Sequence, residues 1–163
     1  MKLKVAFTSD SARILYSRRP LQYQTHGSAG FDLMAHAIHS GGVDYNIEDP
    51  FILHPNQRIL IKTGLAFGIE EGYEVQIRSR SGLALKNGVM VLNSPGTIDS
   101  DYRGEIGVVL LNTDSFKNFQ IAFGDRICQA VVSKLDICQF DLVSIDDLEE
   151  TDRSSGGFGS TGI

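Results

Sequence analysis

Acidic, basic and hydroxyl side chains stand beside glycines in four short segments of this chain. The first is GSAGFDLMA, residues 27–35, where Asp32 lies inside an apolar run. Such a carboxylate either ends a strand or orients a water molecule bound to a metal ion. In the second, RSRSGLA, the residues Arg80, Ser81 and Gly82 follow a strand-like run. Backbone N–H groups at a helix start attract phosphate, and a guanidinium and a hydroxyl strengthen that attraction, although Ser81 is equally suited to cap the helix.

The third segment, NSPGTIDSDYRGEIGV (residues 93–108), has the pattern strand, turn, strand. Pro95–Gly96 and the stretch 99–104 have the composition of turns. The segment also carries two carboxylates, Asp99 and Asp101, and a tyrosine. It is therefore either an ordinary turn or a hairpin that binds a nucleobase through main-chain hydrogen bonds.

The fourth segment, GDRICQAVV, contains Asp125 and Arg126, which we expect to form a local ion pair that holds a turn, and Gln129 follows on a strand. The four histidines do not have the spacing of zinc ligands, so a zinc ion held by protein side chains is not expected. They are His26, His36, His39 and His54.

The last residues, RSSGGFGSTGI, are rich in glycine and serine, as flexible linkers are. They also contain one cation, Arg153, and one aromatic ring, Phe158. Taken alone, this tail is either disordered without a role or a segment that orders around a ligand.

Alternating apolar residues predict the strands that must position these groups. In YEVQIRS, residues 73–79, one face is apolar and the other polar, as in a half-buried strand. Similar runs follow, punctuated by Gly, Asn, Asp or Pro, so we expect an all-β sandwich or barrel. These runs are KLKVAF, RILIKTGLAFGI, VMVLN, EIGVVLLN, FQIAF, ICQAVVSKL and FDLVSI. One short helix is expected over SGLALKNG, ending at Gly88.

The acidic stretch DDLEETD, residues 146–152, leads from the last expected strand to the tail. We therefore expect a β-rich domain over residues 1–150 and a flexible arm over residues 151–163. Residues 38–50 lie outside the four segments, and the family resemblance set out below implies a loop insertion there.

Composition limits the possible partners and the cellular location. The chain has 163 residues, 42% hydrophobic and 21% charged, which suits one globular domain. The net charge of −5 argues against general nucleic-acid binding, while a local basic pocket is still allowed. The two cysteines suggest free thiols in a reducing compartment, and no signal peptide or membrane span is apparent. We expect a soluble cytoplasmic protein with no membrane association.

The four segments and the glycine-rich tail, in this order, resemble the trimeric deoxyuridine triphosphatase (dUTPase) family. The resemblance runs from Gly27 to Gly162 and implies an all-β, jelly-roll-like fold that assembles as a homotrimer. It implies hydrolysis of dUTP to dUMP and diphosphate by water attack at the α-phosphorus, which keeps uracil out of DNA and supplies dUMP for thymidylate synthesis. It further implies a Mg²⁺ cofactor held by the three phosphates and by water.

The resemblance also assigns roles to particular residues. Asp99 matches the carboxylate that activates water, Tyr102 matches the ring that excludes a 2′-hydroxyl group, and Asp32 matches the carboxylate that orients metal-bound water. The positions matching the uracil site are Asn93, Gly96, Thr97, Ile98 and Gly107. The positions matching the phosphate site are Arg80, Ser81, Gly82 and Gln129.

The tail matches an arm that crosses to a neighbouring subunit and closes over its substrate. Phe158 would stack on uracil, and Arg153 with Gly159, Ser160 and Thr161 would hold the phosphates.

Three other functions remain open from the sequence. A dCTP deaminase shares the fold of the resembling family, but it needs a deaminating site, and the third segment here keeps GTIDSDY as a dUTPase would. A nucleotide-gated signalling protein could use the same pocket without turnover. A sugar-binding jelly roll would leave the phosphate-type tail unexplained.

Overall fold

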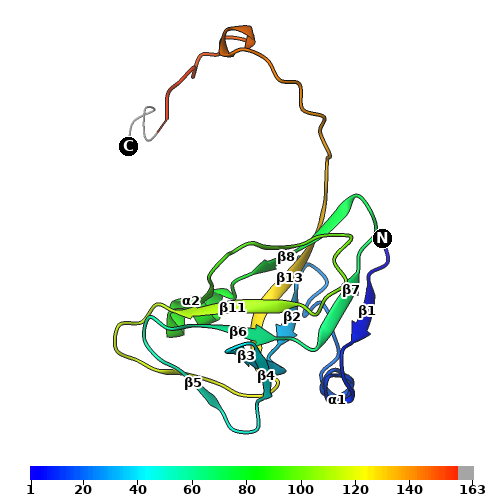
Figure 1. The fold of residues 1–163 in the computed structure, drawn as a ribbon, viewed down its shortest axis with the longest axis vertical. Helices are drawn as coiled ribbons and strands as arrows, with labels where there is room; N and C mark the ends of the chain where they lie inside the picture. The colour runs from blue at the N-terminus through cyan, green and yellow to red at the C-terminus, as the bar shows by residue number, and fades with distance from the viewer. Residues whose placement is uncertain (158–163) are drawn as a thin grey trace.

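The alternating pattern of the sequence forms antiparallel β-strands in four sheets (Figure 1). The structure, a computed structural model, describes residues 1–157. One large sheet contains, in spatial order, β10 (Gly96–Ile98), β8 (Tyr73–Arg78), β13 (Arg126–Lys134) and β2 (Phe31–Met34). The other contains β4 (Val43–Asn46), β3 (Ala37–Ser40), β6 (Arg58–Lys62), β11 (Gly107–Asn112) and β9 (Val89–Val91). The smaller pairs are β1 (Lys4–Phe7) with β7 (Leu65–Gly68), and β12 (Phe119–Ile121) with β5 (Phe51–Leu53).

One apolar core lies between the two large sheets. Val75 of β8 and Leu33 of β2 belong to the same buried cluster as Ile61 of β6 and Leu110 of β11. The inward residues of each strand alternate with more exposed ones, as in β11, which confirms the all-β prediction. Among the described residues, neither helix is long and apolar enough to cross a membrane.

Two predicted segments differ from the structure. Residues 140–145, FDLVSI, form no strand, and a 3-10 turn follows at Ile145–Asp147. Phe140 and Leu142 are 88% and 94% exposed, so no residue of the described part, 1–157, covers these two side chains. The expected loop at residues 38–50 is mostly the hairpin of β3 and β4. Its turn, Gly41–Gly42, has φ angles of 60° and 82°, which only glycine adopts readily at both positions.

The expected short helix is present as α2 (Ser81–Asn87). Gly88 ends it in the left-handed conformation, with φ of 64°, and donates its N–H to the carbonyl oxygen of Ala84. The alternative in which Ser81 caps this helix is wrong, because Arg80 occupies the N-cap position and makes no side-chain capping bond.

A second helix, α1 (Asp10–Arg18), was missing from the prediction of one short helix. Its signals are local: the Ser9 side chain accepts the N–H of Ala12, and Asp10 and Arg18 suit the two ends of the helix dipole. Only three of its residues are buried, so the helical pattern in the sequence is weak.

Helix α1 packs on the turn between β6 and β7. The Tyr16 hydroxyl donates to the carbonyl oxygen of Thr63 at 3.1 Å and accepts from the N–H of Met34 at 3.2 Å. The Nε2 atom of His36 lies 2.8 Å from Ser11 Oγ, and burial lowers the pKa of His36. These contacts fix α1 beside β2, which carries Asp32.

After β13 the chain leaves the body of the molecule (Figure 1, orange). Both cysteines are free: Cys128 is buried in β13, whereas Cys138 is exposed in the departing segment. Sheet structure among the described residues thus ends at Lys134. The division into residues 1–150 and 151–163 stays a prediction.

Position 64 requires glycine for two reasons, its backbone conformation and the close approach of Ala12. Its φ is +76°, and an added Cβ would lie 2.5 Å from Ala12 Cβ. Gly72 has a similar φ of +83° with no neighbour within 4 Å, so it is a matched control. We expect Gly72→Ala to lower the free energy of unfolding by about 1–2 kcal/mol through backbone strain. Gly64→Ala should lower the free energy of unfolding by a further ~1–3 kcal/mol, because the added methyl group displaces α1. Urea unfolding checks this, and equal losses in the two variants would contradict it.

Candidate active site

Asp32 is the centre of a carboxylate–arginine cluster. Its Oδ1 accepts from Arg80 Nε at 3.0 Å, and its Oδ2 accepts from Arg126 Nη1 at 3.1 Å. Arg80 also donates through Nη1 to the main-chain oxygen of Arg126 at 2.8 Å. The Asp32 side chain is only 16% exposed, so the charges meet at a partly dry surface. The cluster brings together the first, second and fourth sequence segments.

The expected ion pair between Asp125 and Arg126 is wrong. Asp125 Oδ2 instead accepts the N–H of Ala122 at 2.8 Å and closes the turn, while Arg126 reaches Asp32. The expected turn at Asp125 is therefore confirmed, whereas the expected ion pair with Arg126 is not.

A β-bulge at the start of β13 explains how Arg126 and Gln129 reach the same side of the sheet. Residues three apart in a regular strand point to opposite faces. Here Gln129 pairs with Asp32, and the register then shifts so that Arg126, two residues before Cys128, pairs with Met34. The extra residue, Ile127, is buried in the core. The bulge thus places Arg126 and Gln129 on the face that carries Asp32.

Ser79 joins this cluster to the hairpin of the third segment. Its carbonyl oxygen accepts from Gln129 Nε2 at 2.9 Å, and its hydroxyl accepts the N–H of Val91 at 2.9 Å. Its own N–H donates to Ser94 Oγ at 3.3 Å. Sequence reasoning missed Ser79. The available signal was its position between Arg78 and Arg80, directly after a clearly predicted strand.

The hairpin forms a small pocket of about 80 Å³. Every residue expected at the uracil site lines it, together with three apolar side chains of β8, β9 and β11. The lining residues are Ile77, Val91, Asn93, Gly96, Thr97, Ile98, Gly107 and Val108. An added Cβ at Gly96 would lie 3.4 Å from Asn93 Nδ2, so a larger residue there would crowd the amide. The pocket offers an apolar slot beside one amide and main-chain polar groups, which is suited to a flat polar ring.

Asp99 follows β10 but lines a different, wider hollow, together with Asp101, Arg103 and Leu135. It is exposed. The structure thus brings the predicted base-binding residues together but does not place the Asp99 carboxylate among the residues that line their pocket.

The Tyr102 ring lies over Gly104, where an added Cβ would be 2.4 Å from the Tyr102 hydroxyl oxygen. That hydroxyl donates to the main-chain oxygen of Glu105 at 3.0 Å. The Glu105 side chain accepts from the N–H of Gly64 at 2.7 Å and pairs with Lys62 Nζ at 3.2 Å. Glu105, which sequence reasoning did not single out, therefore anchors the turn that presents Tyr102 and Asp99.

The remaining predicted residues are open to solvent. Ser81 and Gly82 begin α2 on the surface, and no atom lies within 4 Å of where a Gly82 Cβ would be. Arg153 donates through Nε to the main-chain oxygen of Gly156 at 2.9 Å, within its own turn. Four predicted residues lie outside the described part of the chain. They are Phe158, Gly159, Ser160 and Thr161.

Within residues 1–157, no group of three or more His, Cys, Asp or Glu side chains could hold a metal ion directly. Asp32 uses one hydrogen bond on each carboxylate oxygen, which leaves each oxygen a further lone pair. Asp32 is thus able to accept from a metal-bound water, and the surrounding arginines suit the phosphates that would carry the metal.

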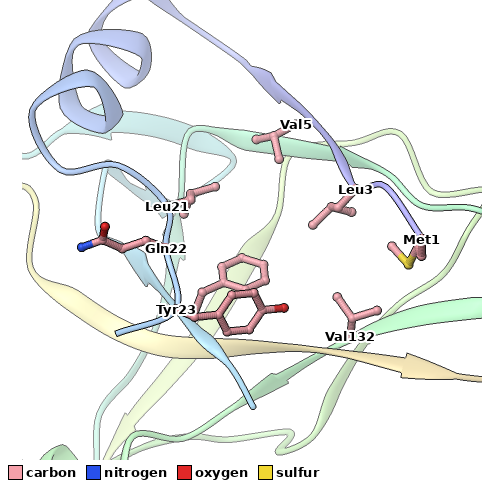
Figure 2. Close-up of a pocket in the computed structure, with 8 residues that line it drawn as sticks. Met1, Leu3, Val5, Leu21, Gln22, Tyr23 and Val132 are labelled. Atoms are coloured by element: carbon pink, nitrogen blue, oxygen red, sulfur yellow. The ribbon is translucent and has the colours of Figure 1, made fainter. Parts of the chain in front are cut away.

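A separate apolar pocket of about 350 Å³ lies between β1 and the β2–β13 edge. Figure 2 shows Leu3, Tyr23 and Val132 around one space, with the Gln22 amide directed away from it. The predicted site residues do not line this pocket, and the sequence patterns gave no indication of it.

Comparison with known proteins identifies the family. Residues 19–162 match the family model described as dUTPase. A deoxyuridine 5′-triphosphate nucleotidohydrolase of Nautilia profundicola is 49% identical over 162 residues, covering 99% of both chains. One from Wolinella succinogenes is 54% identical over 140 residues, covering 86% of this chain and 84% of its own.

The fold has a counterpart among solved structures. A mutant dUTPase of Staphylococcus bacteriophage 80alpha, solved with dUpNHpp, superposes with a TM-score of 0.76 at 24% identity, covering 99% of each chain. This likeness confirms the jelly-roll-like fold that the sequence implied. The family-model match and the relatives at about half identity show that the chain belongs to the dUTPase family.

Proposed function

We propose that this protein hydrolyses dUTP to dUMP and diphosphate, and thereby keeps uracil out of DNA and supplies dUMP. The observation that carries the proposal is the small hairpin pocket of about 80 Å³, which Ser79 joins to the Asp32–Arg80–Arg126 cluster. A slot for a flat base beside a basic cluster is what a deoxynucleoside triphosphate requires.

Uracil enters the hairpin pocket in this proposal. The Asn93 amide and the main chain of β10 donate to and accept from its polar edge, while Ile77 and Val91 pack against the ring. The narrow walls exclude the methyl group of thymine. A rigid wall matters, because one methyl group in a yielding pocket changes binding by only ~1–3 kcal/mol.

The phosphates lie along Arg80, the start of α2 and Gln129. Asp99 takes a proton from the attacking water, whose oxygen bonds to the α-phosphorus while the α–β bridging bond breaks and diphosphate leaves. A Mg²⁺ ion, held by the phosphates and by water that Asp32 orients, would withdraw charge from the phosphate oxygens.

The active site is completed by neighbouring copies of the chain, in a homotrimer that exchanges its C-terminal arms. One support is that Asp99 and the base pocket line separate hollows within one chain. A second is that the segment after β13 carries exposed Ile137, Phe140 and Leu142, while the apolar pocket of Figure 2 is open on the body. Exchange between copies would bury both surfaces. The arm from residue 151 then brings Arg153 and Phe158 over the neighbour's substrate.

Asp99→Asn tests the proposed base. This change removes the proton acceptor but keeps the side-chain shape, so we expect turnover of dUTP to fall by ~10²-fold or more with binding of a non-hydrolysable dUTP analogue retained. Asp101→Asn is the matched control, because Asp101 lines the same hollow two residues away. Release of diphosphate is the measurement, and a loss below threefold in Asp99→Asn would refute the role. Absence of turnover in the wild type would refute the function itself.

Tyr102 is expected to set the choice of sugar. The wild type should hydrolyse dUTP far faster than UTP at equal concentration, because the ring occupies the 2′ side. Tyr102→Ala should narrow that ratio, whereas Tyr102→Phe, which keeps the ring and loses only the bond to the Glu105 oxygen, should preserve it. A kcat/KM ratio that is unchanged in Tyr102→Ala would show that another group excludes the hydroxyl.

Assembly is tested by sedimentation. The wild type should sediment near three times its 17.9 kDa chain mass. Charges at two exposed apolar positions, Phe140→Asp with Leu142→Asp, should dissociate it, since each carboxylate would be buried without a partner. A chain ending at Thr151 is the control: it should stay trimeric but lose turnover, because it lacks the arm. A fully active monomer would contradict the proposed exchange.

A further inference from the structure

A basic hollow lies beside Asp32 and shares no lining residue with the base pocket. It has a volume of about 470 Å³, and we call it the arginine pocket. Its polar lining consists of Arg18, Arg19, Gln22, Gln24, Asp32 and Arg126. Two of the arginines come from the end of α1 and the third from β13, so segments far apart in sequence converge here.

The charge in this pocket is unbalanced. Three guanidinium groups face one carboxylate, and both oxygens of that carboxylate are already engaged by Arg80 and Arg126. The nearby Asp125 is turned back to the N–H of Ala122 and does not line the pocket. This excess of positive charge stands in a chain whose net charge is −5. The dipole of α1 accounts for a cation in its last turn but not for Arg126 or the two glutamines.

One arginine is held in place before any ligand arrives. Arg19 Nη1 donates to the main-chain oxygen of Gly124 at 2.6 Å, which fixes its guanidinium at the rim. Its remaining N–H groups donate to no other residue in the described part of the chain, and they lie in a fixed planar geometry. A site that is ordered in advance loses less conformational entropy when a ligand binds.

We propose that the arginine pocket binds a diphosphate group. Guanidinium groups bind phosphate oxygens through paired hydrogen bonds, and the amides of Gln22 and Gln24 supply further donors. Three cations suit a group with several negative charges better than a single phosphate. Because the pocket shares Asp32 and Arg126 with the proposed phosphate site, the group is either the terminal phosphates of the nucleotide or the free diphosphate that hydrolysis releases.

One arginine of this pocket, Arg18, precedes the match to the family model, whereas the other polar lining residues lie within it. The match to that model begins at residue 19, whereas α1 spans Asp10–Arg18. The inference rests on the proposed function only for the origin of the diphosphate, since binding can be measured without turnover.

Calorimetric titration of the full-length protein with inorganic diphosphate tests the proposal. We expect Arg18→Ala to weaken binding by on the order of tenfold and Arg18→Glu to weaken it more, because each charge-assisted contact is lost or reversed. Arg13→Ala and Arg13→Glu are matched controls on the same helix: the Arg13 guanidinium lies 6.0 Å from the centre of the Phe7 ring, outside the pocket lining. They should bind diphosphate as the wild type does. Melting curves confirm that each variant is folded.

Two further titrations identify the source of the group. If a non-hydrolysable dUTP analogue loses affinity in Arg18→Ala while dUMP does not, the pocket holds the terminal phosphates of the bound nucleotide. If only free diphosphate loses affinity, the pocket holds the released product. Undetectable diphosphate binding by the wild type, or equal losses in the Arg18 and Arg13 variants, would overturn the proposal. Neither result depends on whether dUTP is hydrolysed, so failure of the proposed function would be seen separately.

Discussion

The carboxylate of Asp32 is the contact around which the described site is organised. It receives Arg80 from the start of α2 and Arg126 from the start of β13, and so holds three separate parts of the chain at one point. Arg126 is half exposed, so its pair with Asp32 adds little to the free energy of folding, about 0–1 kcal/mol. The effect of the two pairs is on geometry: they fix the direction of two guanidinium groups. Asp32 and Arg126 line the arginine pocket. Arg80 directly follows Ser79, whose hydroxyl accepts the N–H of Val91 in the base pocket.

Much of the fold was predictable because strand burial leaves a period of two in the sequence. The run YEVQIRS indicated β8, and Gly88 correctly marked the end of α2. The same rule failed at FDLVSI, where Leu142 and Val143 interrupt the alternation and where no described residue covers Phe140 or Leu142. A pattern of this kind indicates an apolar surface that would be buried, but it does not indicate whether the same chain or another molecule buries it. Helix α1 was missed because few of its residues are buried.

The residues of the candidate site were predictable, but the hydrogen bonds and ion pairs between them were not. The hairpin residues from Asn93 to Gly107 come together as expected, because they are close in sequence. The partner of Arg126 was not predictable, since it depends on a one-residue bulge that reverses the face of a strand. Ser79 and Glu105 were missed for a related reason. Ser79 bonds to Val91 and Gln129, and Glu105 bonds to the main chain of Gly64 in another part of the sequence. Contacts of this kind leave no signal in the composition of the sequence.

The two cysteines differ in a way that has a practical consequence. Burial raises the pKa of the Cys128 thiol far above its usual range and shields it from reagents, whereas Cys138 is exposed within the segment that follows β13. A thiol-reactive dye would therefore attach at one known position in each chain without any engineered substitution. That position lies two residues from Phe140, inside the stretch that is proposed to pack on a neighbour. The natural sequence thus already carries a single-site fluorescent labelling point, and energy transfer between labelled chains would report whether their tails come together as proposed.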